Sequence, residues 1–198
     1  MGLVFNYQEG QTPLSESERE GLKIKTITTQ NELNEFEQLN IESATEWLLN
    51  TKLKQDNILT EVFIKKLHIK MFGNVWKWAG AFRQTNKNIG VEWYLISLEL
   101  KKLLEDTHFW IVNNSYNDDE IAIRFKHRLV AIHCFPNGNG RHSRVMADVI
   151  MENIFKKDAF TWHKSNLVKA NAIRKEYIDA LKKADSGNIK PLIEFAKK

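Results

Sequence analysis

Residues 133–144 read HCFPNGNGRHSR, with a proline and two glycines between two helical patterns. Apolar residues recur at helical spacing over 118–133 before this stretch and over 141–155 after it. Gly138 and Gly140 therefore fall where a tight loop must join two helices, because glycine adopts backbone conformations that other residues avoid. We expect the chain to be organised around this loop.

The predicted loop has the features of an anion site. Backbone N–H groups freed by the glycines can turn inward, and the positive end of the following helix dipole adds to them. Arg141 and Arg144 share one face of that helix's first turn, where arginine normally opposes the dipole, so they indicate an anionic ligand. His133 would face the same space with the side chain that exchanges protons most readily near neutral pH. The plainer alternative is a corner between two helices whose arginines are solvated.

The stretch resembles the signature of the Fic family, which reads His-x-Phe-x-(Asp/Glu)-Gly-Asn-(Gly/Lys)-Arg-x-x-Arg. Asn137 departs from it, because most adenylylating members place an acid there that holds Mg²⁺. The resemblance implies an all-α fold, a Fic-type helical bundle with one small β-hairpin called the flap. Seven positions match the signature at fixed spacing, namely His133, Phe135, Gly138, Asn139, Gly140, Arg141 and Arg144.

The resemblance also implies a protein adenylyltransferase, which moves AMP from ATP to a Ser, Thr or Tyr hydroxyl of a target protein. His133 would take the proton from that hydroxyl as general base. Mg²⁺ would bridge phosphate oxygens, with Asn137 as a weak ligand, because its amide oxygen is neutral and Mg²⁺ prefers carboxylates.

The residues expected to bind the nucleotide lie in the loop and in the first helical turn after it. Asn139 and the loop amides would hold the α-phosphate, where negative charge develops during transfer. Arg141 and Arg144 would hold the β- and γ-phosphates by forked hydrogen bonds. The full predicted set is Asn137, Gly138, Asn139, Gly140, Arg141 and Arg144.

Asn137 leaves a second function open. Members of the related Doc group also carry Asn at this position and transfer phosphate instead, but they usually follow it with Ala and place Lys where this chain has Gly140. The Gly-Asn-Gly context therefore favours adenylylation. A third alternative is an inactive module that keeps the anion pocket and binds nucleotide or protein.

Residues 84–91 carry the strongest strand signal in the chain, with Asn, Lys and Gly between two short runs. They predict a β-hairpin, and in the Fic family the corresponding segment is a flap that pairs with the target's backbone. An exposed strand edge can bind an extended peptide in this way. The alternative is a structural corner. The predicted target-docking residues are Gln84, Thr85, Asn86, Lys87, Asn88, Ile89, Gly90 and Val91.

The chain divides by pattern into an arm over 1–28, a helix over 29–55 and a Fic domain over 56–198. The arm shows little periodicity and is assigned no chemistry. Thr29 and Glu32 have the spacing of a capping box, followed by an apolar helical stripe that includes Phe36. The caps expected for later helices are Thr60, Asn117 or Asp118, and Ser165. No internal repeat or low-complexity tract interrupts this order.

Many Fic proteins place a glutamate on a helix where it occupies the γ-phosphate position. Glu37 is the favoured candidate here, and Glu32 is the alternative, although Glu32 already serves the capping box. We expect the glutamate to hold Arg144 and keep the enzyme inhibited. A solvated Glu37 is the competing interpretation, since exposed ion pairs contribute only about 0–1 kcal/mol.

Composition limits the remaining possibilities. The 198 residues carry a net charge of +4, 42% are hydrophobic and none of their apolar runs is long enough for a membrane span. Lysines are interspersed with acids, which makes nucleic-acid binding unlikely. Cys134 is the one cysteine, which fits a reducing cytoplasm, and we do not expect it to be a nucleophile. His68 lies on an apolar stripe and is expected to be a hydrogen-bonded core residue.

The wider pattern, including the Ile-Thr-Thr entry to the N-terminal helix and Asn-Ile-Glu before Trp47, resembles the Fic subfamily known as mobile mystery protein B. Such proteins are found with a helix-turn-helix partner. The resemblance therefore implies a separate regulatory partner, while the residues themselves specify none.

Overall fold

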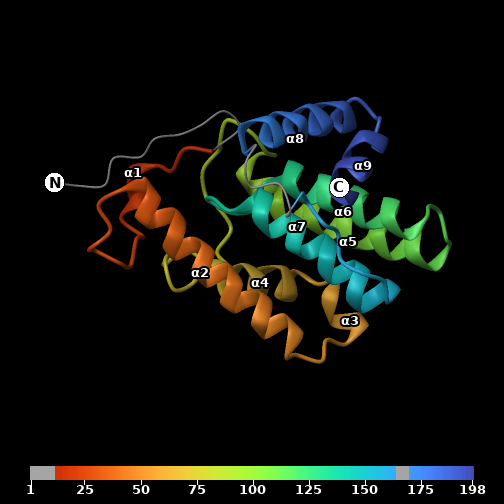
Figure 1. The fold of residues 1–198 in the computed structure, drawn as a ribbon, viewed down its shortest axis with the longest axis horizontal. Coiled ribbons are helices and arrows are strands. Elements are labelled where there is room, and N and C mark those ends of the chain that lie inside the picture. Colours follow the sequence, from red (N-terminus) through yellow and green to blue (C-terminus); the bar gives the residue numbers. More distant parts are fainter. Residues whose placement is uncertain (1–11, 164–169) are drawn as a thin grey trace.

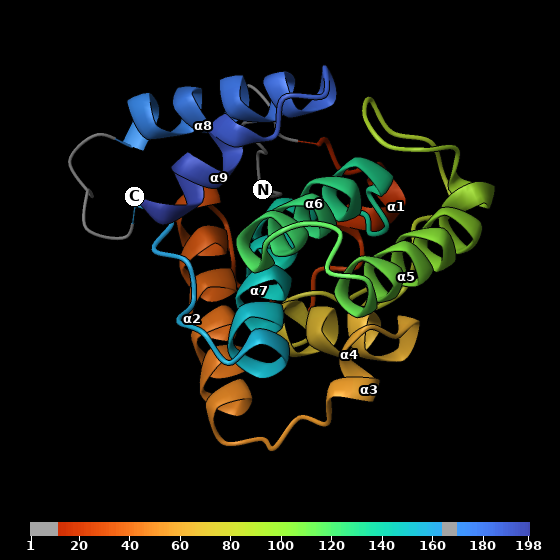
Figure 2. The ribbon, with the colours of Figure 1, turned by 90° about the vertical axis from the view of Figure 1, so that its right-hand side faces the viewer.

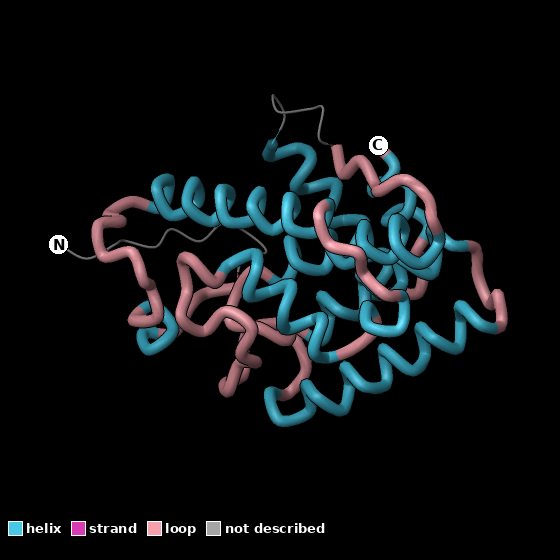
Figure 3. Tube along the Cα trace, turned by 90° about the horizontal axis from the view of Figure 1, so that it is seen from below, coloured by secondary structure: helices cyan, strands magenta, loops and turns pink. Residues whose placement is uncertain are grey.

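The computed structural model describes residues 12–163 and 170–198. This part of the chain is helical, and Figure 3 shows its helices joined by loops. A turn of 3₁₀-helix spans Trp93–Leu95, and a π-helical turn spans Met151–Phe155. The helices are α1 Glu16–Arg19, α2 Gln30–Leu49, α3 Gln55–Ile58, α4 Glu61–Phe72, α5 Ile96–Val112, α6 Asp118–Ile132, α7 Asn139–Ile150, α8 Ala170–Asp185 and α9 Lys190–Lys197.

Helices α6 and α7 pack against each other and connect the remaining layers (Figures 1 and 2). Helix α5 packs on α6, helix α4 packs on α7, and α2 lies against α4. The C-terminal helices α8 and α9 pack against each other, and α9 also contacts α6. The loop between α6 and α7 is thus carried by the two helices that hold the layers together, which gives it a rigid support.

One apolar core joins these helices. It contains the predicted stripes of α4 and α6, and helix α2 adds Leu33 and Ala44 to the same cluster. Phe36, which the apolar pattern of α2 had placed on the buried stripe, is instead 41% exposed. The core residues at the centre of the bundle are Ile64, Leu67, Met71, Leu100, Leu103, Phe125, Leu129, Met146 and Ile150.

The predicted helix caps are confirmed. The Thr29 hydroxyl accepts from the Glu32 N–H at 3.2 Å, and the Glu32 carboxylate accepts from the Thr29 N–H at 3.0 Å. The Thr60 hydroxyl accepts from the N–H of Phe63 at 3.1 Å, and Asn117 caps α6. A cap predicted at Ser165 lies outside the described residues.

The β-hairpin predicted for residues 84–91 is wrong. The segment is a loop with no ladder between its two arms. Within residues 12–163 and 170–198 the antiparallel bridge that does form joins Leu22 to Trp76, and it ties the N-terminal segment to the end of α4.

The side chain of Arg83 explains why the hairpin does not form. Its guanidinium donates to the carbonyls of Thr85, at 2.8 Å, and of Val91, so one side chain bridges both arms. The backbone N–H of Arg83 bonds the Cys134 carbonyl at 3.0 Å, and that of Val91 bonds the Ile132 carbonyl at 3.3 Å. Both ends of the loop therefore pair with the residues around the end of α6, and they leave no cross-strand partners for each other.

None of the helices in the described ranges combines the length and the apolar character that a bilayer crossing requires.

Candidate active site

The loop between α6 and α7 depends on two residues in left-handed conformation. His133, which the sequence placed in the last turn of α6, follows that helix with φ +58°. Gly138 begins α7 with φ +79°, and a Cβ there would lie 2.6 Å from the Phe72 ring. Only glycine meets both conditions, because any other side chain adds strain and a clash. His133 is thereby turned out of the helix and toward the loop.

Asn139 braces this loop. Its side-chain amide donates to the Phe135 carbonyl at 2.7 Å and accepts from the Phe135 N–H at 2.9 Å. Both ends of the amide are therefore used within the protein. The side chain therefore braces the loop in this structure, and the predicted contact of Asn139 with the α-phosphate stays a prediction. The backbone N–H of Asn139 belongs to the first turn of α7, where helix N–H groups favour an anion.

His68 of α4 supports the loop from below. Its Nε2–H donates to the Asn137 carbonyl at 3.1 Å, its Nδ1 accepts from the Gly80 N–H at 3.0 Å, and its ring stacks on Phe135 at 3.8 Å. Full burial holds the pKa of His68 well below its usual value, so the ring is neutral. The prediction of a hydrogen-bonded core histidine is confirmed, although no local pattern indicated that His68 holds this loop.

The His133 imidazole has the properties of a general base. His133 is 5% exposed, and its Nε2 lies 3.0 Å from the hydroxyl oxygen of Thr12. Burial, with the neighbouring Arg83 guanidinium, lowers the pKa of His133 to about 4. Its Nδ1 has no hydrogen-bond partner among the described residues. At neutral pH the ring is uncharged, and Nε2 can accept a proton.

A cavity of about 940 Å³ opens beside His133. Its lining includes the predicted loop residues and the first turn of α7 on one side, with residues of α2 and α8 on the other. No side chain caps α7, so the N–H groups of its first turn remain for an anion. The volume lies in the range of small-molecule sites. The predicted nucleotide residues that line this cavity are Asn137, Gly138, Asn139, Gly140, Arg141 and Arg144.

Glu37 of α2 reaches into this cavity, but its partner differs from the predicted one. Its carboxylate accepts from Arg141 at 2.6 Å and from the indole N–H of Trp76 at 2.6 Å. Arg144 instead lies over the Tyr177 ring at 5.4 Å. The prediction that Glu37 pairs with Arg144 is therefore wrong. Glu37 lies about two turns along α2 from the cap at Thr29. At this place it meets Arg141 in the first turn of α7 rather than Arg144 in the second.

Glu32, the alternative inhibitory residue, stays at the start of α2. Its carboxylate accepts from the N–H groups of Thr28 and Thr29 at 2.8 and 3.0 Å, and these bonds lower its pKa. The residue is not among those that line the cavity. Capping the start of α2 is therefore the role of Glu32 in this structure.

Asn137 offers little to a metal ion. Its amide oxygen accepts from the Gly138 N–H at 2.6 Å, and its amide nitrogen donates to the Thr12 carbonyl at 3.4 Å. The described residues hold no group of three or more His, Cys, Asp or Glu side chains placed to bind a metal. The donor set does not fit a Mg²⁺ site made by the protein alone, and any ion here must be held mainly by a ligand's own oxygens.

Cys134 is excluded as a nucleophile. Its side chain is fully buried, and burial raises the pKa of the thiol to about 12. The thiol is therefore protonated and has no access to a substrate, as the sequence had indicated.

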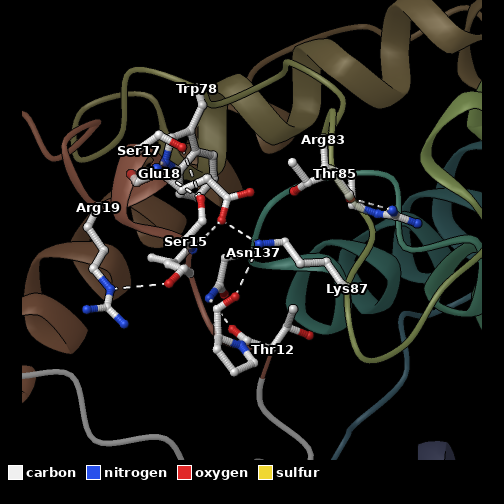
Figure 4. A network of polar contacts seen from close by, with 12 residues as sticks. Thr12, Ser15, Ser17, Glu18, Arg19, Trp78, Arg83, Thr85, Lys87 and Asn137 are labelled. Atoms are coloured by element: carbon white, nitrogen blue, oxygen red, sulfur yellow. Dashed lines mark hydrogen bonds and ion pairs between the residues drawn. The ribbon is translucent and has the colours of Figure 1, made fainter.

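The loop of residues 84–91 lies beside His133. Gly90 has φ +106°, and a Cβ there would lie 2.7 Å from that of His133. Lys87 turns the other way, donates to the Pro13 carbonyl at 3.2 Å and forms an ion pair with Glu18 (Figure 4). The predicted flap thus contacts the N-terminal segment of its own chain.

Thr12 is the functional-site residue that sequence reasoning missed. The arm over 1–28 had been assigned no chemistry, yet the hydroxyl of Thr12 faces His133 and its carbonyl faces Asn137. Pro13 favours an extended backbone at Thr12, which is the one local signal in the sequence. Nothing local places that segment against a loop more than 100 residues away.

The family pattern of the Fic/DOC family matches residues 58–151, the range that contains α4, the loop of residues 84–91 and the His133 loop. This part of the chain is a Fic/DOC domain. The matched range contains α4, α5, α6 and α7 in full, and the cavity is lined by residues of this range together with residues of α2 and α8.

Two relatives indicate how far the likeness extends along this chain. "Probable protein adenylyltransferase y4lH" of Sinorhizobium fredii is 27% identical over 174 residues, which cover 84% of this chain and 83% of that protein. "Protein adenylyltransferase Fic" of Aedes aegypti is 23% identical over 86% of this chain. The alignment spans only 32% of the insect protein, so this chain corresponds to about a third of it.

Solved structures share the fold. The BepC protein of Bartonella tribocorum, with bound AMPPNP, has a TM-score of 0.66 at 19% identity and covers 92% of this chain and 97% of that one. Fic-1 of C. elegans has a TM-score of 0.65 at 21% identity over 81% of this chain and 47% of that one. These likenesses confirm the predicted Fic-type helical bundle.

Proposed function

We propose that the chain is a protein adenylyltransferase that moves AMP from ATP to a hydroxyl side chain of a protein. The observation that carries the proposal is the position of His133. Its uncharged Nε2 already lies at hydrogen-bond distance, 3.0 Å, from a hydroxyl oxygen, and the cavity beside it is lined by the first turn of α7. A proton acceptor and an anion site therefore meet in one cavity, as phosphoryl-group transfer to a hydroxyl requires.

The reaction follows from these positions. The acceptor hydroxyl gives its proton to Nε2 of His133 as its oxygen attacks the α-phosphorus of ATP. A bond forms between that oxygen and the α-phosphorus, the bond from the α-phosphorus to the bridging oxygen breaks, and pyrophosphate leaves. The neutral histidine can take the proton, and the adjacent phosphate charge raises its affinity for it.

The phosphates are proposed to bind at the start of α7. Backbone N–H groups of the first turn and the helix dipole favour negative charge there. Arg141 and Arg144 add the forked donors that hold phosphate oxygens. The relative BepC was solved with AMPPNP, a nucleoside triphosphate analogue, which supports ATP as the co-substrate here. Mg²⁺ is proposed to arrive with the triphosphate and to take at most one neutral oxygen, from Asn137.

The resting enzyme is proposed to be self-inhibited by Glu37. The Glu37 carboxylate uses donors of Arg141 that a phosphate would need, and the Glu37 side chain is only 8% exposed. A charge-assisted bond in such a shielded place is stronger than one at the surface. ATP must displace Glu37 before Arg141 can bind a phosphate.

The target is proposed to be a protein with a Ser, Thr or Tyr side chain that reaches His133 beside the loop of residues 84–91. A regulatory partner of the helix-turn-helix class is proposed from the subfamily resemblance alone. A cytoplasmic location is proposed because the lone Cys134 is a buried, protonated thiol of the kind that reducing compartments maintain.

The test is incubation of the purified chain and of cell extract with α-labelled ATP, followed by intact-mass measurement. An AMP-sized gain on protein is expected. A phosphate-sized gain would show a phosphotransferase instead, and no gain on any protein, even with Glu37 replaced, would show a binding module without activity.

A further inference from the structure

The hydroxyl that faces His133 belongs to the chain itself. Thr12 is 6% exposed, and its Oγ1 lies 3.0 Å from Nε2 of His133. In the neutral tautomer that carries its proton on Nδ1, the imidazole has a lone pair on Nε2, and the Thr12 O–H donates to it. This is the position that an acceptor hydroxyl must take if His133 is to remove its proton.

The segment around Thr12 is held from both sides. Asn137 donates to the Thr12 carbonyl, and Lys87 donates to the carbonyl of Pro13 (Figure 4). Leu14, the next residue, is buried in the core at 4% exposure. Asn137 of the His133 loop and Lys87 of the predicted flap thus bind the chain's own N-terminal segment. This segment lies in the place proposed for a target.

The remainder of the arm fixes this segment to the core. Ser15 begins α1 with a capping box, and Glu18 of α1 forms the ion pair with Lys87. The Glu18 carbonyl also accepts from the Trp78 indole at 2.9 Å. Since the arm is anchored just after Thr12, the hydroxyl is presented to His133 at a high effective concentration.

The hydroxyl groups that line the cavity favour Thr12 as the acceptor. Among the described residues that line the cavity, Thr12 and Tyr177 carry hydroxyl groups. The Tyr177 oxygen accepts from Nζ of the buried Lys126 side chain at 2.5 Å. Thr12 alone of these two has a proton acceptor in place, and the cavity beside it extends to the first turn of α7.

We infer that Thr12 is an intramolecular acceptor and that the chain transfers AMP from ATP to its own Thr12 hydroxyl. The inference rests on the proposed function and names one substrate of the same site. The Thr12 proton goes to His133 Nε2, a bond forms between Thr12 Oγ1 and the α-phosphorus, and pyrophosphate is released.

The experiment uses the purified full chain, as wild type and with Glu37→Gln, incubated with ATP across a dilution series. Intact mass gives the number of AMP groups, and peptide mapping gives their positions. Thr12→Val removes the acceptor, and Thr12→Ser restores a hydroxyl. Ser17→Ala is the matched control, because Ser17 is an exposed hydroxyl of the same arm. Circular dichroism checks that each variant is folded.

The expected result is one AMP on the peptide that carries Thr12, at a rate that does not depend on protein concentration. The gain should be lost in Thr12→Val and in His133→Ala and kept in Thr12→Ser and Ser17→Ala. A rate proportional to protein concentration would overturn the intramolecular step.

Two further outcomes separate this inference from the proposed function. Labelling of other proteins with an unmodified Thr12 peptide, in the Glu37→Gln background, would overturn the inference and leave the proposed function standing. An absence of AMP from every protein, including this chain, would overturn both.

Discussion

Glu37 and Arg141, 104 positions apart in the chain, form a 2.6 Å ion pair across the cavity beside His133. The pair joins α2, which lies outside the matched Fic range of 58–151, to the first turn of α7 inside it. Helix α2 thereby supplies a carboxylate to the guanidinium that is proposed to bind a phosphate. Whether a phosphate can bind at α7 depends on how strongly the Glu37 carboxylate competes for Arg141.

Replacing Glu37 should therefore activate transfer. Glu37→Gln removes the charge but keeps an oxygen for the Trp76 indole, and Glu37→Gly removes both. A hydrogen bond to a charged group is worth about 1.5–3 kcal/mol, so each change should tighten ATP by about 10- to 100-fold. ATP titration by calorimetry and the rate of AMP transfer measure the effect.

The control for this prediction is Glu32→Gly at the start of the same helix. It should lower the free energy of unfolding by about 1 kcal/mol through the lost capping box and leave ATP affinity unchanged. If Glu37→Gln and Glu37→Gly both leave ATP affinity and transfer at the wild-type level, inhibition by α2 is excluded.

Asn137→Asp should lower the Mg²⁺ concentration needed for half-maximal transfer. A carboxylate adds a charged oxygen ligand in the loop, and the oxygen bonded to the Gly138 N–H is kept. The same change removes the N–H that bonds the Thr12 carbonyl, so the arm should be held less tightly. Titration of Mg²⁺ against turnover checks it, and an unchanged metal requirement would place the ion away from Asn137.

The pH dependence of transfer should show how strongly burial acts on His133. Because its pKa is lowered to about 4 from the usual 6.5, the base stays neutral as the pH falls through 6. The acid limb of kcat/KM, which reports the free enzyme, should lie below pH 6. The limb of kcat should lie higher, since bound phosphate charge raises the pKa. A kcat/KM limb at pH 6.5 or above, in protein that stays folded by circular dichroism, would contradict a His133 pKa that burial lowers.

Two glycines of the loop should respond in opposite ways to alanine. Gly138→Ala forces a side chain into a left-handed backbone 2.6 Å from the Phe72 ring, and it should cost about 1–3 kcal/mol or more of the free energy of unfolding. Gly140→Ala meets nothing within 4 Å and lies inside α7, so it should be neutral or stabilise by about 0.5–1 kcal/mol. Urea unfolding of the two variants measures the difference. Equal losses would mean that the loop does not require the backbone described here.

The parts of the structure that the sequence predicted are those set by local signals. The caps at Thr29 and Thr60 and the apolar stripes of the helices need only neighbouring residues to be recognised. The His133 loop was predicted for the same reason, since its glycines and arginines are contiguous. Periodicity and spacing are properties of a short stretch, and they survive folding.

The parts that the sequence missed depend on contacts between distant segments. The pattern at 84–91 indicated a hairpin, but the guanidinium of Arg83 donates hydrogen bonds to the carbonyls of Thr85 and Val91 and the hairpin does not form. The partner of Glu37 was assigned as Arg144, and only the packing of α2 decides that it is Arg141. The arm gave no periodic signal, although Thr12 lies in the cavity. Long-range pairing of this kind leaves no mark on local composition.

His133 is proposed to remove the proton of the hydroxyl that receives AMP. The most direct measurement is the initial rate of AMP transfer by His133→Ala, in the Glu37→Gln background, beside ATP binding by calorimetry. Loss of a general base predicts a rate lower by about 10²–10⁴-fold, with ATP affinity and thermal unfolding close to those of the parent. Transfer to a protein hydroxyl at the parent rate would exclude His133 as the general base.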